Sequence, residues 1–226
     1  MADICVLAPA FYPDAAPVWR LVESARRFDI PLTLYGLGEP NQGWIYSHIT
    51  RLREELEART EKLFMFTDAI DCFFLRDLNA IVRWWEKRKR GTPLVVAASE
   101  TTGLNAGGFI GNRIIMIDLL RRLELGLYGD LGDPQVRWRA AYGHGALGID
   151  EDSEIFQTTS GEVRLSTVNS GEVPGIFNVD TGYRPCLLHC NGGYTDPVTF
   201  KSDRMDYWWR FAGMDKQVMR WESVNG

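Results

Sequence analysis

The residues best suited to chemistry in this sequence are Asp68 and Asp71, which directly follow the unbroken apolar run 63–66. A run this apolar predicts a strand covered on both faces, as in a parallel sheet, and such sheets bind ligands beyond the carboxyl ends of their strands. Two carboxylates three positions apart repel each other, and a divalent cation between them removes that repulsion. The open positions of the cation would then bind phosphate oxygens. The pair therefore indicates a metal site that holds a diphosphate.

Two other interpretations of this pair are open at this point. In the first, one aspartate caps the next helix and the other is merely solvated. In the second, the chain is a phosphohydrolase of the haloacid dehalogenase type, which also places aspartates after an apolar strand. That motif spaces its aspartates two apart, whereas Asp68 and Asp71 are three apart.

Strands and helices alternate around the aspartates over the first hundred residues. Apolar runs predict strands at 4–8, 32–36, 63–67 and 94–98. Helical spacing of apolar residues predicts helices at 17–28, 49–59, 78–85 and 114–125. Such alternation predicts a parallel, doubly wound sheet of the α/β class.

The second half of the sequence is less regular. A glycine-rich segment, 105–111, precedes the helix at 114–125, and beyond Asp150 the apolar pieces are short. These pieces, at 155–157, 163–165, 176–179 and 186–189, are typical of antiparallel or edge strands. The tail carries Trp208, Trp209, Phe211 and Trp221, and we expect it to dock against the domain.

Length and composition limit the possible functions. With 226 residues we expect a single domain over 1–226. Within it we distinguish a first half, 1–104, a second half, 105–193, and a C-terminal tail, 194–226. The formal net charge of -5 argues against a binder of polymeric nucleic acid.

Cysteine usage and hydropathy indicate a cytosolic protein. Cys5, Cys72, Cys186 and Cys190 show no paired metal-finger spacing, which indicates small buried hydrophobes. The first residues lack a basic leader, and no apolar run approaches the roughly 18 residues that a membrane span needs. We therefore expect a soluble, cytoplasmic protein without a membrane span.

Four separated segments, taken together, resemble one family. They are the acidic segment 66–71, the glycine-rich segment 104–111, Asp150 with 155–157 and Gly161, and the segment 189–192 of sequence His-Cys-Asn-Gly. Their order and spacing resemble the glycosyltransferase domain of procollagen lysyl hydroxylases and related procollagen glycosyltransferases. The likeness covers about 30–193 of the chain.

This resemblance implies a GT-A fold, with a Rossmann-like, mostly parallel sheet and an irregular, partly antiparallel C-terminal half. It implies that 1–104 is the nucleotide-binding half and 105–193 the donor and acceptor half. It also implies a divalent metal, Mn²⁺ or Mg²⁺, and a UDP-sugar donor of glucose or galactose. Position by position, Asp68 and Asp71 would be metal ligands, and His189 would be the third. Manganese accepts mixed carboxylate and imidazole ligands, and a late strand ending in His189 can reach the same sheet edge.

The resemblance also implies residues for the donor and for catalysis. Those expected to bind the donor are Gly38, Trp44, Asn105, Gly107, Gly108, Asn191 and Gly192. Those expected around the donor sugar and the reaction centre are Asp133, Gln135 and Asp150. Asp133 precedes Pro134, however, which is also the ordinary pattern of a helix N-cap and first helical position.

Several positions depart from the pattern of the family. The family carries an aromatic residue between its two metal aspartates, which stacks on the uracil, where this chain has Ile70. The two alternatives are weaker binding of the base and stacking by Trp44 or Tyr46. A lysine of the following helix is replaced by His48 or its neighbours. The segment 100–105 is shorter than in the collagen-modifying enzymes, which argues against collagen as the acceptor.

The sequence therefore predicts an enzyme, a metal-dependent hexosyltransferase that moves a hexose from a UDP-sugar to a hydroxyl group of a glycan, a protein or a small molecule. An inverting reaction would use Asp133 or Asp150 as the base, and a retaining reaction would need none. The alternatives are a sugar-nucleotide or glycan binding module that has lost turnover and the phosphohydrolase named above.

Overall fold

The computed structural model describes residues 3–88, 95–100, 103–129, 133–159, 163–168, 175–191 and 203–214. The centre of the described fold is a six-stranded sheet of order β2-β1-β3-β6-β5-β7. Its strands are β1 (Ile4–Pro9), β2 (Leu32–Tyr35), β3 (Leu63–Thr67), β5 (Val95–Glu100), β6 (Gly103–Asn112) and β7 (Gly148–Ile149). Five of these strands run in one direction and β6 runs antiparallel to both of its neighbours. The predicted α/β class with a mostly parallel sheet is confirmed.

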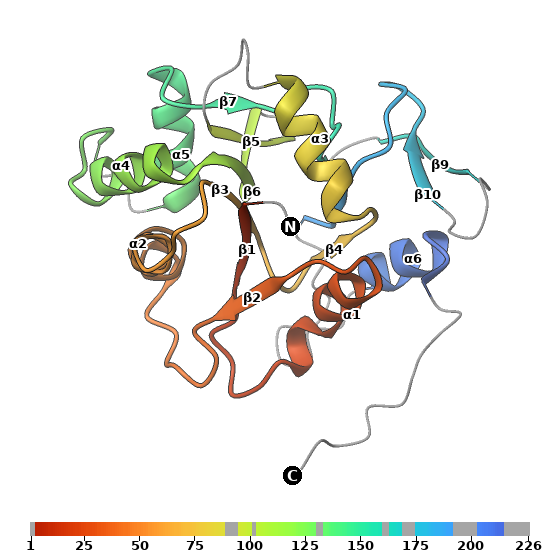
Figure 1. Ribbon diagram of the computed structural model, residues 1–226, viewed down its shortest axis with the longest axis horizontal. Helices are drawn as coiled ribbons and strands as arrows, with labels where there is room; N and C mark the ends of the chain where they lie inside the picture. Colours follow the sequence, from red (N-terminus) through yellow and green to blue (C-terminus); the bar gives the residue numbers. More distant parts are fainter. Residues whose placement is uncertain are drawn as a thin grey trace.

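Helices cover both faces of this sheet (Figure 1). On one face lie α1 (Trp19–Arg27) and α3 (Leu78–Arg88), and on the other lie α2 (Arg51–Glu57), α4 (Arg113–Glu124) and α5 (Pro134–Gly143). Successive side chains of a strand point to opposite faces. Met65 accordingly packs in the cluster of α1 and α3, while Phe64 and Phe66 pack in the cluster of α2, α4 and α5. This two-sided burial explains the unbroken apolar run before Asp68.

A smaller sheet continues from the end of β3. It contains β4 (Cys72–Phe74), β11 (Leu187–His189) and β8 (Phe156–Thr158) in the order β4-β11-β8. Strand β11 is antiparallel to β4 and parallel to β8. A separate hairpin pairs β9 (Leu165–Val168) with β10 (Gly175–Asn178). The short strands expected beyond Asp150 are therefore present, and β4, β6 and β7 are additional to the predicted strands.

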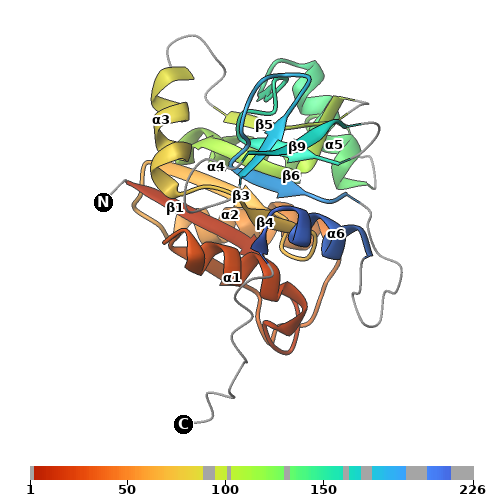
Figure 2. The same ribbon diagram turned by 90° about the vertical axis from the view of Figure 1, so that its right-hand side faces the viewer.

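The described part of the tail forms α6 (Asp203–Phe211), which lies beside α1 and β4 (Figure 2). Trp209 is 4% exposed and packs edge-on against Trp19 and Phe73. An ion pair between Arg20 and Asp206 joins the same two helices. Docking of the tail is confirmed for these residues, and Trp221 lies outside the described residues.

The glycine-rich segment forms most of β6, at the centre of the large sheet between β3 and β5. Glycine is depleted in strands, so the sequence does not predict a strand here. The structure gives a reason for two of these glycines, because a Cβ on Gly107 or Gly108 would lie within 3.0 Å of His189 or Phe156 respectively. Both faces of β6 are packed so closely at these positions that only glycine, which has no side chain, fits there.

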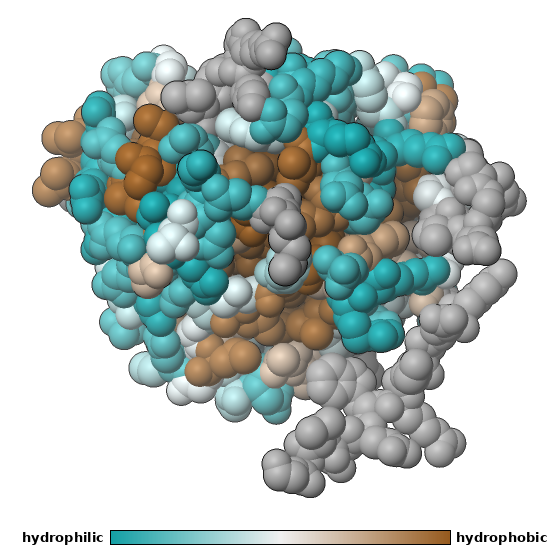
Figure 3. Space-filling model, in the orientation of Figure 1, coloured by the Kyte–Doolittle hydropathy of each residue, from teal (hydrophilic) through white to brown (hydrophobic). Residues whose placement is uncertain are grey.

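The surface is mixed, with apolar areas at the left and across the centre of the face shown in Figure 3. Leu125 and Leu127, which follow α4, are 75% and 64% exposed. All four cysteines are free and buried, as predicted. Among the described helices, none has the length and apolar character to cross a membrane.

Candidate functional site

A cavity of about 370 Å³ opens at the carboxyl ends of β1 and β3. Pro9 and Phe11 line it from the end of β1, and Asp68 and Asp71 line it from the end of β3. This is the edge of the sheet at which the sequence predicts a ligand site. The cavity therefore places both aspartates where a bound molecule would meet them.

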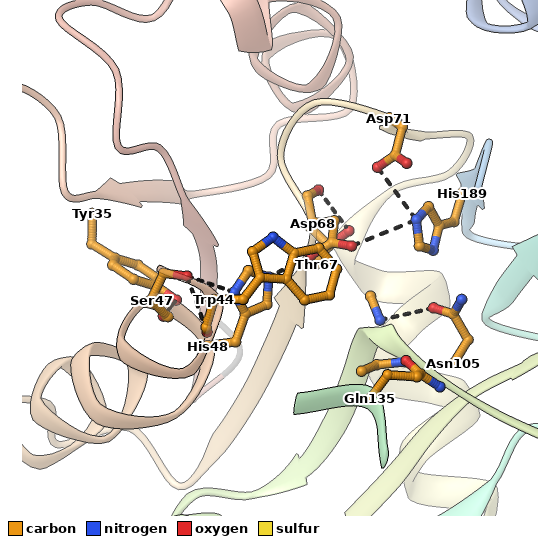
Figure 4. A network of polar contacts seen from close by, with 12 residues as sticks. Tyr35, Trp44, Ser47, His48, Thr67, Asp68, Asp71, Asn105, Gln135 and His189 are labelled. Atoms are coloured by element: carbon orange, nitrogen blue, oxygen red, sulfur yellow. Dashed lines mark hydrogen bonds and ion pairs between the residues drawn. The ribbon is translucent and has the colours of Figure 1, made fainter. Parts of the chain in front are cut away.

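The pairing of β4 with β11 brings His189 to the acidic turn. Strand β4 begins directly after Asp71, and in its register with β11 His189 lies opposite Cys72. The backbone N–H of Cys190 donates to the carbonyl of Asp71 over 2.7 Å, which fixes the two segments together. As a result, His189 Nε2 lies 3.3 Å from Asp71 Oδ1 and 3.6 Å from Asp68 Oδ2 (Figure 4). Residues 118 positions apart thus converge, as the sequence predicts.

Gly107 makes room for this convergence. A Cβ on Gly107 would lie 2.1 Å from Cε1 of His189 and 2.6 Å from Oδ2 of Asp68. Its carbonyl accepts from the backbone N–H of Asp68 over 2.9 Å, and its own N–H donates to Asn105 Oδ1 over 2.8 Å. The backbone of β6 therefore forms a close floor beneath the imidazole and the carboxylate.

A second imidazole contacts Asp68 from the opposite side. Nε2 of His48 lies 2.9 Å from Asp68 Oδ1, and the ring of His48 is stacked on Trp44 with centroids 4.6 Å apart (Figure 4). His48 comes from the π-helical turn Tyr46–Thr50, which precedes α2. Apart from the noted replacement of a lysine, no sequence signal marks His48 as a site residue, because its approach to Asp68 depends on the tertiary fold.

The charges of the site shift the pKa values of its groups. Burial raises the pKa of Asp68, but the hydrogen bond to His48 and the charges of His48 and His189 lower it by more, so the pKa of this carboxyl lies below its usual range. Burial lowers the pKa of His189, but the charges of Asp71 and Asp68 raise it by more, so the pKa of this imidazole lies above its usual range. Burial and the same two aspartates raise the pKa of Tyr12 to about 12. The two aspartates therefore give the site a negative electrostatic potential.

The residues present fit a divalent cation. Two carboxylates and one imidazole point into one space, and this donor set suits manganese. The buried Nδ1 atom of His189 has no hydrogen-bond partner among the described residues, so the ring is held through Nε2 by the two aspartates. A cation in that space would compensate two carboxylates whose side chains are only 15% and 8% exposed.

Cys72 is a possible alternative ligand, because one ligand atom each from Asp71, Cys72 and His189 lie within 4.8 Å of one another. Burial, followed by the charges of Asp71 and Asp68, raises the pKa of Cys72 well above its usual range. A neutral thiol is a poor metal ligand, since the thiolate is the form that binds metals. Cys72 also does not line the cavity, whereas Asp68 does. Asp68 is therefore the better third ligand, although its carboxylate lies outside the group within 4.8 Å and would have to move toward Asp71 to share a cation with it.

The structure brings together some of the expected donor-binding residues and not others. The cavity is lined by Trp44, Asn105, Gly107 and Asn191. Gly38 and Gly108 do not line it. Gly38 lies in a loop with a φ of 75°, and the position of a Cβ on Gly108 points at the ring of Phe156. Gly192 lies outside the described residues. Phe11, Tyr12, Asn41 and Ser47 also line the cavity and were not predicted.

Of the three residues expected at the reaction centre, only Gln135 lines the cavity. Its carboxamide is engaged by the backbone of β6: Oε1 accepts from the N–H of Ala106 over 2.8 Å and Nε2 donates to the carbonyl of Leu104. Asp133 is exposed and caps α5, accepting from the N–H of Gln135 over 2.8 Å. The N-cap interpretation of Asp133 and Pro134 is thus confirmed, and this placement argues against Asp133 as a base.

Asp150 is also placed away from the cavity. It is 3% exposed, and its carboxylate accepts the backbone N–H groups of Glu154, Ile155 and Phe156 over 3.2, 2.7 and 2.9 Å. These three bonds close the turn that leads into β8. The geometry therefore favours a structural part for Asp150 over a catalytic one.

This burial gives a testable pH dependence of stability. Burial raises the pKa of Asp150 to about 6, although the three N–H groups oppose the shift. A carboxyl whose pKa is higher in the folded state adds stability at low pH, which is lost as the pH rises through the folded value. The quantity to compare is the free energy of unfolding of the parent minus that of Asp150→Asn. We expect this difference to be larger at pH 4 than at pH 7, by most of about 3 kcal/mol. Urea unfolding at both pH values measures this difference, and a difference independent of pH would contradict the assignment.

Comparisons with known proteins support the fold. No protein-family model matches the sequence, and no curated protein matches it. Among solved structures, the chain is similar to a glycosyltransferase involved in glycosylation of the major capsid of PBCV-1, with a TM-score of 0.58 and 10% identity over 90% of this chain and 97% of that one. It is also similar to the glycosyltransferase GlyE of Streptococcus pneumoniae TIGR4, with a TM-score of 0.55 and 15% identity over 98% of this chain and 62% of that one.

These likenesses show a fold shared with glycosyltransferases. The chain spans less than two thirds of GlyE, at 62% of its length. At such identities the likeness extends to the fold alone, so the relation to the procollagen enzymes stays a hypothesis.

Proposed function

We propose that the protein is a metal-dependent glycosyltransferase that moves a hexose, glucose or galactose, from a UDP-sugar to a hydroxyl acceptor. The observation that carries the proposal is the convergence of Asp68, Asp71 and His189 in a cavity at the sheet edge of a fold shared with glycosyltransferases. The resemblance of the four sequence segments to the procollagen glycosyltransferases supports the same choice. The expected location in the cytoplasm stays a prediction.

Asp68, Asp71 and His189 are the residues that would hold the cation, preferably Mn²⁺. When bound, such an ion supplies Lewis-acid stabilisation for the charge that develops on the leaving diphosphate. The two carboxylates hold negative charge at the bottom of the cavity, and His189, in a fixed position on β11, would supply a nitrogen ligand once the cation displaces its Nε2 proton. Asp71 and His189 are largely pre-organised, because a strand pairing and a backbone hydrogen bond fix their segments.

The remaining lining residues suggest how the donor lies. Trp44 is 52% exposed and offers a ring face for the base, a role that Ile70 between the aspartates cannot fill. Gly107 keeps side-chain atoms away from the space beside the metal ligands. Asn105 and Asn191 also line the cavity with carboxamides, which would give the sugar hydroxyls polar partners. Both amides donate to Glu100, over 3.1 and 3.2 Å, which fixes their orientation.

The placement of the acids bears on the stereochemistry. An inverting transfer needs a base that accepts the proton of the acceptor hydroxyl. Among the described residues, the carboxylates that line the cavity are Asp68 and Asp71, and the proposal assigns both to the cation. The described part of the chain therefore offers no separate carboxylate base at the cavity.

One assay tests the proposal against its alternatives. The protein is incubated with Mn²⁺ and a panel of nucleotide sugars, and the free nucleotide diphosphate is measured with and without EDTA. We expect release of UDP from UDP-glucose or UDP-galactose only, and its loss with EDTA. Release of phosphate from small phosphoesters would instead identify a phosphohydrolase, and donor binding without release would identify a binding module.

A further inference from the structure

We propose that His48 is a positioning residue that orients the carboxylate of Asp68 for the cation and joins this ligand to the exposed ring of Trp44. The proposal rests on the proposed function, because it concerns the same metal site. His48 is one of three histidines in the chain and is 6% exposed.

The two oxygens of Asp68 have different partners. Oδ1 lies 2.9 Å from His48 Nε2, whereas Oδ2 lies 3.6 Å from His189 Nε2 and above Gly107. The terminal torsion of an aspartate is intrinsically broad, so the side chain does not fix the plane of its own carboxylate. The contact with His48 supplies that constraint. It occupies Oδ1 and leaves Oδ2 directed at the space shared with His189 and Asp71.

The ring of His48 is itself fixed from several sides. Its Nδ1 lies 2.7 Å from Ser47 Oγ, one ring face stacks on Trp44 at an interplanar angle of 23°, and Phe66 packs edge-on with centroids 5.5 Å apart. The turn that carries it is anchored by Tyr35, whose hydroxyl donates to the carbonyl of Ser47 over 2.8 Å. π-Helical turns are rare and frequent at functional sites, and this one aims His48 at the acidic turn.

This arrangement resembles the outer shell of known metal sites, in which hydrogen-bonded partners orient the ligands. Here the partner also stacks on Trp44, which lines the cavity. One imidazole thus separates the metal ligand from the aromatic ring that the proposed function assigns to the base. Removal of its N–H and removal of its ring face should have separable effects.

The test measures the binding of Mn²⁺ alone, without a nucleotide. The electron paramagnetic resonance signal of the free ion reports how much Mn²⁺ is unbound. In His48→Phe the ring that stacks on Trp44 is kept and the donor to Asp68 is lost. We expect about a ten- to hundredfold weaker affinity, the usual effect of losing an outer-shell partner. In His48→Gln a donor can take the place of Nε2, and we expect an affinity within about threefold of the parent. His144→Phe is the matched control, because exposed His144 also packs on an aromatic ring, that of Tyr128, and lies outside the cavity lining.

The outcomes separate this inference from the proposed function. If the parent binds Mn²⁺ and His48→Phe binds it equally well, the inference is wrong and the metal site stands. If the parent binds no Mn²⁺, both fail. If His48→Phe does not fold, as judged by circular dichroism, His48→Gln decides alone: retained affinity supports the inference, and a tenfold or greater loss overturns it.

Discussion

Replacing His189 by alanine, or Asp71 by asparagine, should abolish Mn²⁺-dependent binding of a UDP-sugar and leave the fold intact. The first change removes the nitrogen that lies 3.3 Å from Asp71 Oδ1. The second removes a negative charge from a site in which side chains are almost fully buried. Loss of an outer-shell partner alone weakens metal binding by about ten- to hundredfold, so loss of a ligand should exceed about a hundredfold.

Calorimetry with UDP-glucose in the presence of Mn²⁺ measures this effect. The Mn²⁺-induced rise in melting temperature is a second measure, since a ligand that binds only the folded state stabilises it by mass action. Asp118→Asn is the matched control for Asp71→Asn, because the Asp118 side chain is 61% exposed on α4 and pairs only with Arg122 in the described contacts. Equal donor affinity for parent and Asp71→Asn would refute the metal assignment.

Gly107→Ala should disrupt the site as strongly as deletion of a ligand. Its methyl group would lie 2.1 Å from Cε1 of His189, a distance at which something must move. His189 is 3% exposed, and its strand is paired on both sides, so the imidazole has little free space. We expect loss of Mn²⁺ binding, together with the roughly 1–3 kcal/mol of destabilisation typical of overpacking.

Two other glycines serve as controls for this substitution. Gly108 lies next in β6, and a methyl there would meet the ring of Phe156 at 2.7 Å, so Gly108→Ala should lower the free energy of unfolding but retain Mn²⁺ affinity. A Cβ on Gly175 in β10 meets no atom within 4 Å, so Gly175→Ala should change neither quantity. Metal binding by Gly107→Ala at the affinity of the parent would show that the floor of the site is not where the structure places it.

The sequence predicts most of the elements that carry the site. The run before Asp68 is apolar on both faces because helices cover both faces of β3, and this signal is local. The helix at 17–28 and the strand at 186–189 are likewise read from apolar spacing. The central position of β6 could not be predicted, because its glycines are selected by contacts with His189 and Phe156 that only the tertiary structure reveals.

The same distinction applies to the site residues. Asp68, Asp71 and His189 are of residue types that commonly bind metals, and the structure brings their side chains together. Asp133 and Asp150 are acids of the right type, but local backbone geometry uses them: one caps α5 and the other closes the turn before β8. His48 is the opposite case, a site residue that the sequence does not reveal. Its partner Asp68 lies twenty positions away, and no local pattern indicates the contact.

The most direct test of the account is a crystal structure of the protein soaked with MnCl₂ and UDP, with anomalous data collected for manganese. The account predicts one anomalous peak in the cavity, bound by Nε2 of His189 and by the carboxylates of Asp68 and Asp71. An imidazole of His189 that faces away from an empty acidic turn would contradict it.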